Sequence, residues 1–145
     1  MYVLNLDPGS PSASRMTRGY MIIPQEQFEK IVAEAIDELP ENFQDKLHNV
    51  ALFVENFPNR EQMQSTNTKS KWGLLGLFEG YAQAKKLNFG AVLPDIITIF
   101  REPIQRSCND IDICRERIKG VVRHEIAHHL GLGEKGARKA EKRRA

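Results

Sequence analysis

The pattern HExxHxxGxxE, which begins at His124, constrains this chain more than any other feature. In a helix, residues four positions apart lie on one face, so His124 and His128 can direct their imidazoles toward one metal ion. Glu125 lies beside the first histidine, where a carboxylate can take a proton from water. Gly131 can end the helix in a left-handed conformation, which brings Glu134 back as a candidate third ligand. The pattern therefore predicts a zinc-dependent hydrolase.

The residues before the pattern predict the helix that this reading requires. Apolar residues recur mostly three or four positions apart from Ile111 to Ile126, which is typical of an amphipathic helix. Asn109 or Asp110 is expected to cap its start, and the helix is expected to run to about Leu130. The alternative is a core helix with two satisfied histidines and a solvated glutamate, but chance rarely adds the downstream glycine and acid as well.

The third ligand has two candidates, because only fourteen residues follow Gly131. Glu134 and Glu141 are the acidic residues among them. Gly131 returns the chain within reach of the histidines, which favours Glu134 over Glu141.

Other polar side chains are weaker candidates for a role in the site. His129 projects about a hundred degrees from His128 on the helix and is expected to pack or form hydrogen bonds instead. His48 is expected to be a surface residue. Glu79 is the first candidate to support the histidines, although a solvated strand carboxylate is the favoured reading. Tyr81 could assist the oxyanion, a role that the sequence does not favour.

Composition excludes few function classes. The chain has 145 residues, of which 41% are hydrophobic and 28% charged, which fits one soluble domain. A net charge of +2 demands neither a nucleic acid nor a membrane partner. No apolar run is long enough to span a bilayer, and the start lacks the layout of a secretory signal, so a cytoplasmic location is expected.

Cys108 and Cys114 are the only cysteines, and their spacing fits neither a CxxC redox motif nor a zinc knuckle. A disulfide would require that the segment between them is not helical throughout. Two reduced, partly buried thiols in a cytoplasmic protein are the favoured reading.

Periodicity along the chain predicts an α+β domain with helices on one face of a small sheet. Pro24 suits the first turn of the first helix, and Pro40 ends it. The expected elements are a helix over 28–39, a strand over 50–54, a loop or short irregular helix over 59–71, a glycine-rich extended segment over 74–82, a buried strand over 96–100, one helical turn over 104–108, the motif helix, and a basic tail helix over 134–144.

The ends of the chain carry two further expectations. Residues 1–20 are turn-forming and aperiodic, which predicts a disordered leader, an added segment, or a mis-assigned start with Met16 or Met21 as the first residue. Residues 21–145 are then a single domain. The basic run over 134–144 can bind nucleic acid or an acidic partner, but a solvated helix is favoured, so nucleic acid is not expected as a partner.

These features resemble the minimal zincins, small bacterial proteins of the zinc metallopeptidase-like superfamily. The resemblance covers about residues 22–140. The stretches that carry it are the Phe28 helix ending at Leu39-Pro40, Asn49-Val50, Gly76-Leu77-Phe78-Glu79-Gly80, Leu93-Pro94-Asp95-Ile96-Ile97, Phe100-Arg101-Glu102-Pro103-Ile104, and His124-Glu125-Ile126-Ala127-His128-His129-Leu130-Gly131. The doubled histidine before the glycine is especially characteristic of the family.

The resemblance implies a zincin-like fold, with a small mixed or antiparallel sheet and with an N-terminal helix and an active-site helix on one face. It implies one zinc ion held by His124, His128 and Glu134, with Glu125 as the catalytic base. Many relatives carry aspartate where this chain has Glu134. It further implies a peptide or protein substrate, bound in extended form along the segment over 74–81.

Two function classes follow from these observations. The first is a zinc metallopeptidase. The second is a zinc-binding interaction module with little or no turnover, which the small size of the domain keeps open. A nucleic-acid or toxin-system accessory is a third reading that rests on the basic tail alone.

Overall fold

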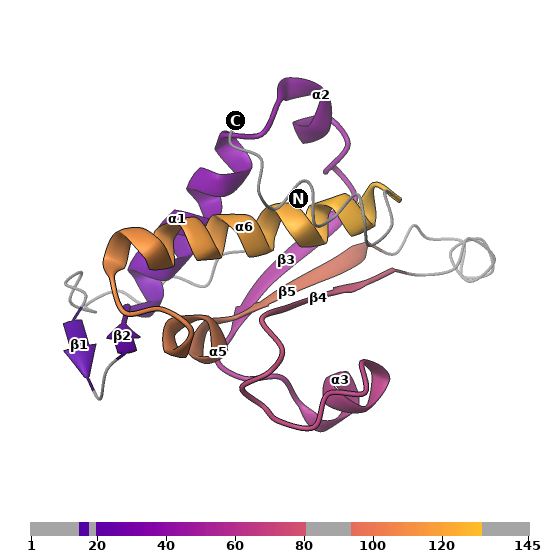
Figure 1. Cartoon of the computed structure of the whole chain (residues 1–145). Helices are drawn as coiled ribbons and strands as arrows, with labels where there is room; N and C mark the ends of the chain where they lie inside the picture. Colours follow the sequence, from indigo (N-terminus) through magenta and orange to yellow (C-terminus); the bar gives the residue numbers. More distant parts are fainter. Residues whose placement is uncertain (1–14, 18–19, 81–93, 132–145) are drawn as a thin grey trace.

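A computed structural model describes residues 15–17, 20–80 and 94–131 of the chain. The described residues form helices, a two-stranded sheet and a three-stranded sheet (Figure 1). In chain order the elements are β1 (Arg15–Thr17), β2 (Tyr20–Ile22), α1 (Gln25–Asp37), α2 (Glu41–Gln44), β3 (Val50–Glu55), α3 (Arg60–Ser65), β4 (Gly76–Glu79), β5 (Asp95–Phe100), α5 (Arg101–Arg106) and α6 (Ile111–His129).

The main sheet has three strands in the order β3-β5-β4. β3 pairs with β5 in parallel, with Leu52 opposite Ile97, and β4 pairs with β5 in antiparallel orientation, with Phe78 opposite Ile97. The sheet is therefore mixed, as the resemblance implies. β5 is the buried central strand that its apolar sequence predicts, and β4 lies at an edge.

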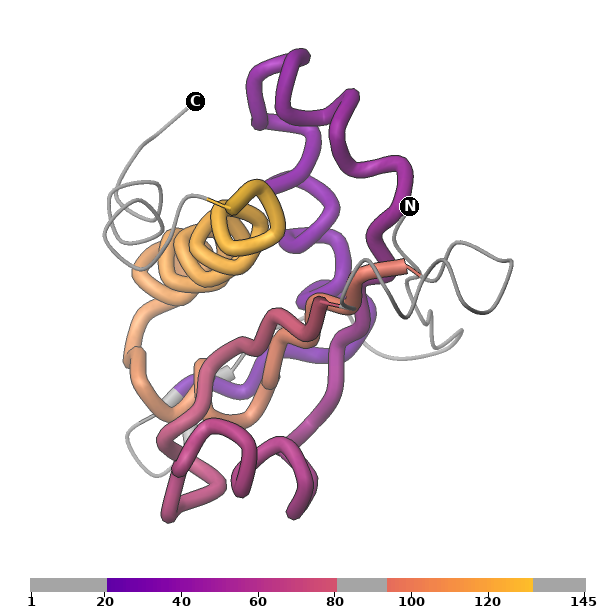
Figure 2. The backbone as a smooth tube through the Cα atoms, turned by 90° about the vertical axis from the view of Figure 1, so that its right-hand side faces the viewer, coloured from indigo at the N-terminus to yellow at the C-terminus, as the bar shows by residue number. Residues whose placement is uncertain are grey.

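Two helices cover one face of this sheet. In Figure 2, α1 and α6 lie on the same side of the three strands. The apolar stripe of α1 is buried as predicted, and it packs with α6 and with the inner residues of β3 and β5 in one hydrophobic core. Its main contributors are Phe28, Ile31, Val32, Ala35, Ile36, Val50, Leu52, Ile97, Ile99, Cys114, Ile118, Val122 and Ile126. The predicted α+β class is confirmed.

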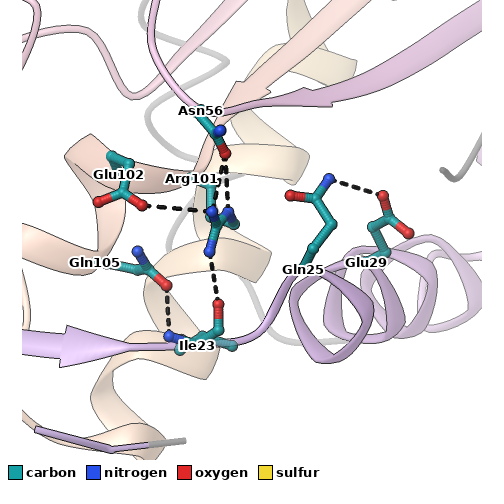
Figure 3. A network of polar contacts seen from close by, with 7 residues as sticks. All are labelled: Ile23, Gln25, Glu29, Asn56, Arg101, Glu102 and Gln105. Carbon is teal, nitrogen blue, oxygen red and sulfur yellow. Dashed lines mark hydrogen bonds and ion pairs between the residues drawn. The ribbon is translucent and has the colours of Figure 1, made fainter. Parts of the chain in front are cut away.

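A polar network fastens the segment before α1 to α5 (Figure 3). The Arg101 guanidinium donates to the carbonyl oxygen of Ile23 at 2.8 Å, and to the side-chain oxygen of Asn56 at 2.9 and 3.1 Å. The side-chain oxygen of Gln105, one helical turn further on, accepts a hydrogen bond from the backbone nitrogen of Ile23. Because both backbone groups of Ile23 are satisfied in this way, the entry to α1 is fixed relative to β3 and α5.

Some elements differ from the sequence-based expectations. Arg15–Thr17 forms a strand with β2, so part of the expected disordered leader is ordered. The helix α2 was not expected, whereas α3 lies in the segment over 59–71, where a loop or a short irregular helix was expected. Residues 1–14 and the basic tail over 134–144 lie outside the described residues. The single domain over 21–145 and the absence of a nucleic-acid partner stay predictions.

The expectation of two reduced thiols is wrong, because Cys108 and Cys114 form a disulfide with their Cα atoms 5.5 Å apart. The chain bends between the end of α5 and the cap of α6, so the segment is not helical throughout. The bond joins the start of α6 to the end of α5. The expected cytoplasmic location loses the support of reduced cysteines and stays a prediction.

Removing the disulfide should destabilise the protein. The bond spans a sequence separation of 6, and closing a loop of that size stabilises a fold by about 2 kcal/mol. We expect Cys108→Ala/Cys114→Ala to lose about that much free energy of unfolding in urea titrations. Reductant should produce a similar loss in the wild type and none in the variant. Equal stability of oxidised wild type and variant would contradict this assignment.

Candidate metal centre

Both ends of α6 are defined by local chemistry. At the start, the Asp110 carboxylate accepts hydrogen bonds from the backbone nitrogens of Asp112 at 2.8 Å and Ile113 at 3.2 Å, which confirms one of the two predicted caps. At the end, Gly131 has a φ of +77° and its nitrogen donates to the carbonyl oxygen of His128 at 3.0 Å. The predicted left-handed glycine after the motif helix is therefore confirmed.

The two motif histidines face each other across one turn of α6. Their Nε2 atoms lie 3.3 Å apart, and their ring centroids lie 5.0 Å apart. Two nitrogens bound at about 2.05 Å to one tetrahedral zinc ion would lie about 3.3 Å from each other. Both rings are half-buried. His124 and His128 are thus spaced as two ligands of one zinc ion would be.

Glu125 lies between α6 and the edge strand β4, with 8% of its surface exposed. A Cβ atom placed on Gly76 would lie 3.2 Å from Cγ of Glu125 and 3.5 Å from its Oε1. The same atom would lie 2.7 Å from Cγ1 of Val121, closer than carbon atoms can pack. Gly76 therefore lets the helix approach the strand closely enough for the Glu125 side chain to lie over the β4 backbone.

His129 does not belong to the candidate ligand set. Its Nδ1 lies 2.7 Å from a carboxylate oxygen of Asp95, and its Nε2 lies 3.2 Å from the carbonyl oxygen of Lys46. Both ring nitrogens are thus directed at hydrogen-bond acceptors, whereas a metal ligand needs a lone pair directed at the ion. The expectation that His129 packs or forms hydrogen bonds is confirmed.

The remaining candidates are either exposed on the surface or outside the described residues. His48 is exposed, as expected, with its Nδ1 3.1 Å from the carbonyl oxygen of Asp45. Glu79 is also exposed, which fits a solvated strand carboxylate. Within residues 15–17, 20–80 and 94–131, no group of three His, Cys, Asp or Glu residues could hold a metal ion. Three candidates, Tyr81, Glu134 and Glu141, lie outside these ranges.

Two features of the site were not assigned from the sequence. The glycine-rich strand was expected to permit close approach of another segment, but the sequence did not indicate that Glu125 would pack on Gly76. Asp95 was part of the resemblance without a role, and its partner His129 was assigned only a general packing role. Each contact joins segments far apart in sequence, so a single sequence offers no spacing rule for it.

Comparison with protein families agrees with this geometry. A family model described as zincin-like metallopeptidase matches residues 47–143, which is more than half of the chain. The chain belongs to the zincin-like metallopeptidase family. The match includes the whole HExxHxxGxxE stretch and begins after α1. A search of curated proteins finds no match.

Membership of the zincin-like metallopeptidases indicates a zinc peptidase type of function in general, with peptides or proteins as substrates. It also agrees with the observed mixture of helices and a small mixed sheet. Among the helices that the structure describes, none has the length and apolar character needed to cross a membrane.

Gly76 offers a direct test of the contact between α6 and β4. We expect Gly76→Ala to lose about 1 to 3 kcal/mol of free energy of unfolding in urea, because the new methyl group overlaps Val121. Gly73→Ala is the matched control, since a Cβ there would meet its nearest atoms at 3.4 and 3.6 Å, and we expect a change within about 0.5 kcal/mol. Equal losses from both variants would argue against a special packing role for Gly76.

Proposed function

We propose that this chain is a zinc-dependent peptidase that hydrolyses peptide bonds. In this proposal His124, His128 and Glu134 hold one zinc ion, and Glu125 is the general base. The observation that carries the proposal is the 3.3 Å separation of the two histidine Nε2 atoms, beside a glutamate held at the edge of the sheet. Membership of the zincin-like metallopeptidases supports the same type of chemistry.

The donor set suits a catalytic rather than a structural zinc ion. Two imidazoles and one carboxylate provide three ligands and leave one coordination position open. The disulfide removes both cysteines as thiolate ligands, so a closed site with cysteine ligands is not available to the oxidised chain. Zinc bound here would lower the pKa of a water molecule and polarise the substrate carbonyl group.

The position of Glu125 supports its proposed role as general base. It follows the first candidate ligand directly in the helix, and its side chain lies over β4 rather than in bulk solvent. In the proposed reaction its carboxylate accepts a proton from the attacking water and then donates it to the nitrogen of the leaving amine. Packing against Gly76 limits the conformations of the side chain, which favours this transfer.

The edge strand β4 is the proposed binding surface for the substrate. Among the strands that the structure describes, β4 pairs with β5 alone. Its second edge is the proposed acceptor of an extended peptide through main-chain hydrogen bonds. Its residues are half-buried or exposed. Because Gly76 of the same strand contacts Glu125, a peptide on this edge would lie close to the proposed base.

Substitution of the base should separate zinc binding from hydrolysis. We expect Glu125→Gln to retain one zinc ion per chain and to lose at least about a hundredfold in peptide cleavage, because the amide cannot accept the proton. His124→Ala should lose both zinc and cleavage. Metal analysis together with a peptide-library cleavage screen provides both readouts.

The outcomes of that experiment distinguish the two function classes. A wild type that binds zinc but cleaves no peptide would favour the interaction module over the peptidase. Full activity of Glu125→Gln would exclude Glu125 as the base.

The third ligand can be tested by paired substitutions in the tail. We expect Glu134→Ala to weaken zinc binding by about tenfold or more, since it removes a direct ligand, and Glu141→Ala to leave binding unchanged within about twofold. Titration with a competing chromophoric chelator measures both affinities. A weaker zinc affinity in Glu141→Ala alone would reverse the assignment.

A further inference from the structure

A buried hydrogen-bonded pair holds the last turn of α6. Nδ1 of His129 lies 2.7 Å from a carboxylate oxygen of Asp95, and the two side chains are 12% and 11% exposed. On its other side the His129 ring lies 3.2 Å from the carbonyl oxygen of Lys46. Asp95 is the first residue of β5, and Lys46 precedes β3. One side chain thus connects the end of α6 to the start of β5 and to the segment between α2 and β3.

The surroundings of this pair restrict its movement. The Phe78 ring of β4 meets the His129 ring edge-on, with centroids 6.1 Å apart. A Cβ atom on Gly80 would lie 2.8 Å from Cζ of Phe78 and 3.5 Å from Oδ1 of Asp95. Phe78 and the Gly80 backbone therefore border the pair on the side of the edge strand. A hydrogen bond between side chains this little exposed to water is stronger than one on the surface.

The pair adjoins the part of the helix on which zinc binding depends. His128 is the last helical residue but one, and helix ends fray because their final carbonyl groups lack intrahelical partners. The 3.3 Å spacing between His124 and His128 exists only while that turn stays helical. Gly131, with its left-handed backbone, follows two residues after His129.

We infer that His129 and Asp95 form a positioning pair for the zinc site. By fixing the last turn of α6 to the start of β5 and to the segment before β3, the pair keeps His128 at its spacing from His124 and sets the direction in which the chain leaves at Gly131. Neither residue contacts the ion. The inference rests on the proposed zinc function and extends it to the doubled histidine and to the aspartate before β5.

The test is a double-mutant cycle on zinc affinity. His129→Phe keeps an aromatic ring against Phe78 but removes both ring nitrogens, and Asp95→Ala removes the carboxylate. We expect each variant to bind Zn²⁺ about tenfold to a hundredfold more weakly than the wild type in chelator competition. The double variant should be about as weak as the weaker single variant, because both substitutions break one unit. If His129→Phe or Asp95→Ala does not fold, Asp95→Asn is a milder replacement.

A second readout separates positioning from general stability. Ile118→Val lies on the same helix and removes one methyl group from the core, so it should lower Tm while leaving zinc affinity unchanged within about twofold. In Co²⁺-substituted protein, the visible absorption bands should change in His129→Phe and not in Ile118→Val, since those bands report coordination geometry.

The results of this test distinguish a failure of the positioning pair from a failure of the proposed zinc function. A wild type without zinc affinity overturns both the zinc function and the pair's role in it. Two results would overturn the positioning pair alone, provided that the wild type binds zinc. The single variants would bind zinc as tightly as the wild type, or the losses of the two single variants would multiply in the double variant.

Discussion

The close packing of α6 against β4 at Gly76 is the contact on which the rest of the site depends. The absence of a side chain there lets Val121 and Glu125 lie directly over the strand. The contact places the proposed base at the edge of the sheet, where an extended peptide could pair. A larger residue would push the helix away from the strand and separate the proposed base from the proposed substrate surface.

The helix is also held at its two ends, by different chemistry at each. The Asp110 cap and the Cys108–Cys114 disulfide fix the start, far from the histidines along the helix axis. His129 and Asp95 fix the end, next to the candidate ligands. Between the two ends of the helix, residues such as Ile118 and Ile126 pack in the hydrophobic core. The candidate zinc site therefore lies on a helix that has stabilising contacts at both ends and core packing between them, which favours a preorganised site.

The sequence predicted the parts of this structure that depend on local periodicity. The stripe of α1 and the pattern of the motif helix each mark one face that must be buried, and the apolar run of β5 marks a buried strand. The capping box from Asn59 to Gln62 could also have indicated α3. The disulfide and the His129–Asp95 pair could not be predicted, because each depends on how the chain folds back on itself. Within the site, the spacing of His124 and His128 could be predicted, because the helix alone brings the two side chains together.

The central claim is that two imidazoles from one turn of α6 bind the same zinc ion. X-ray absorption at the zinc edge, measured on the zinc-loaded wild-type protein, tests this claim most directly. The account predicts only nitrogen and oxygen neighbours at about 2.0 to 2.1 Å, with outer scattering from two imidazole rings. Sulfur neighbours at about 2.3 Å, or a spectrum without imidazole scattering, would contradict it.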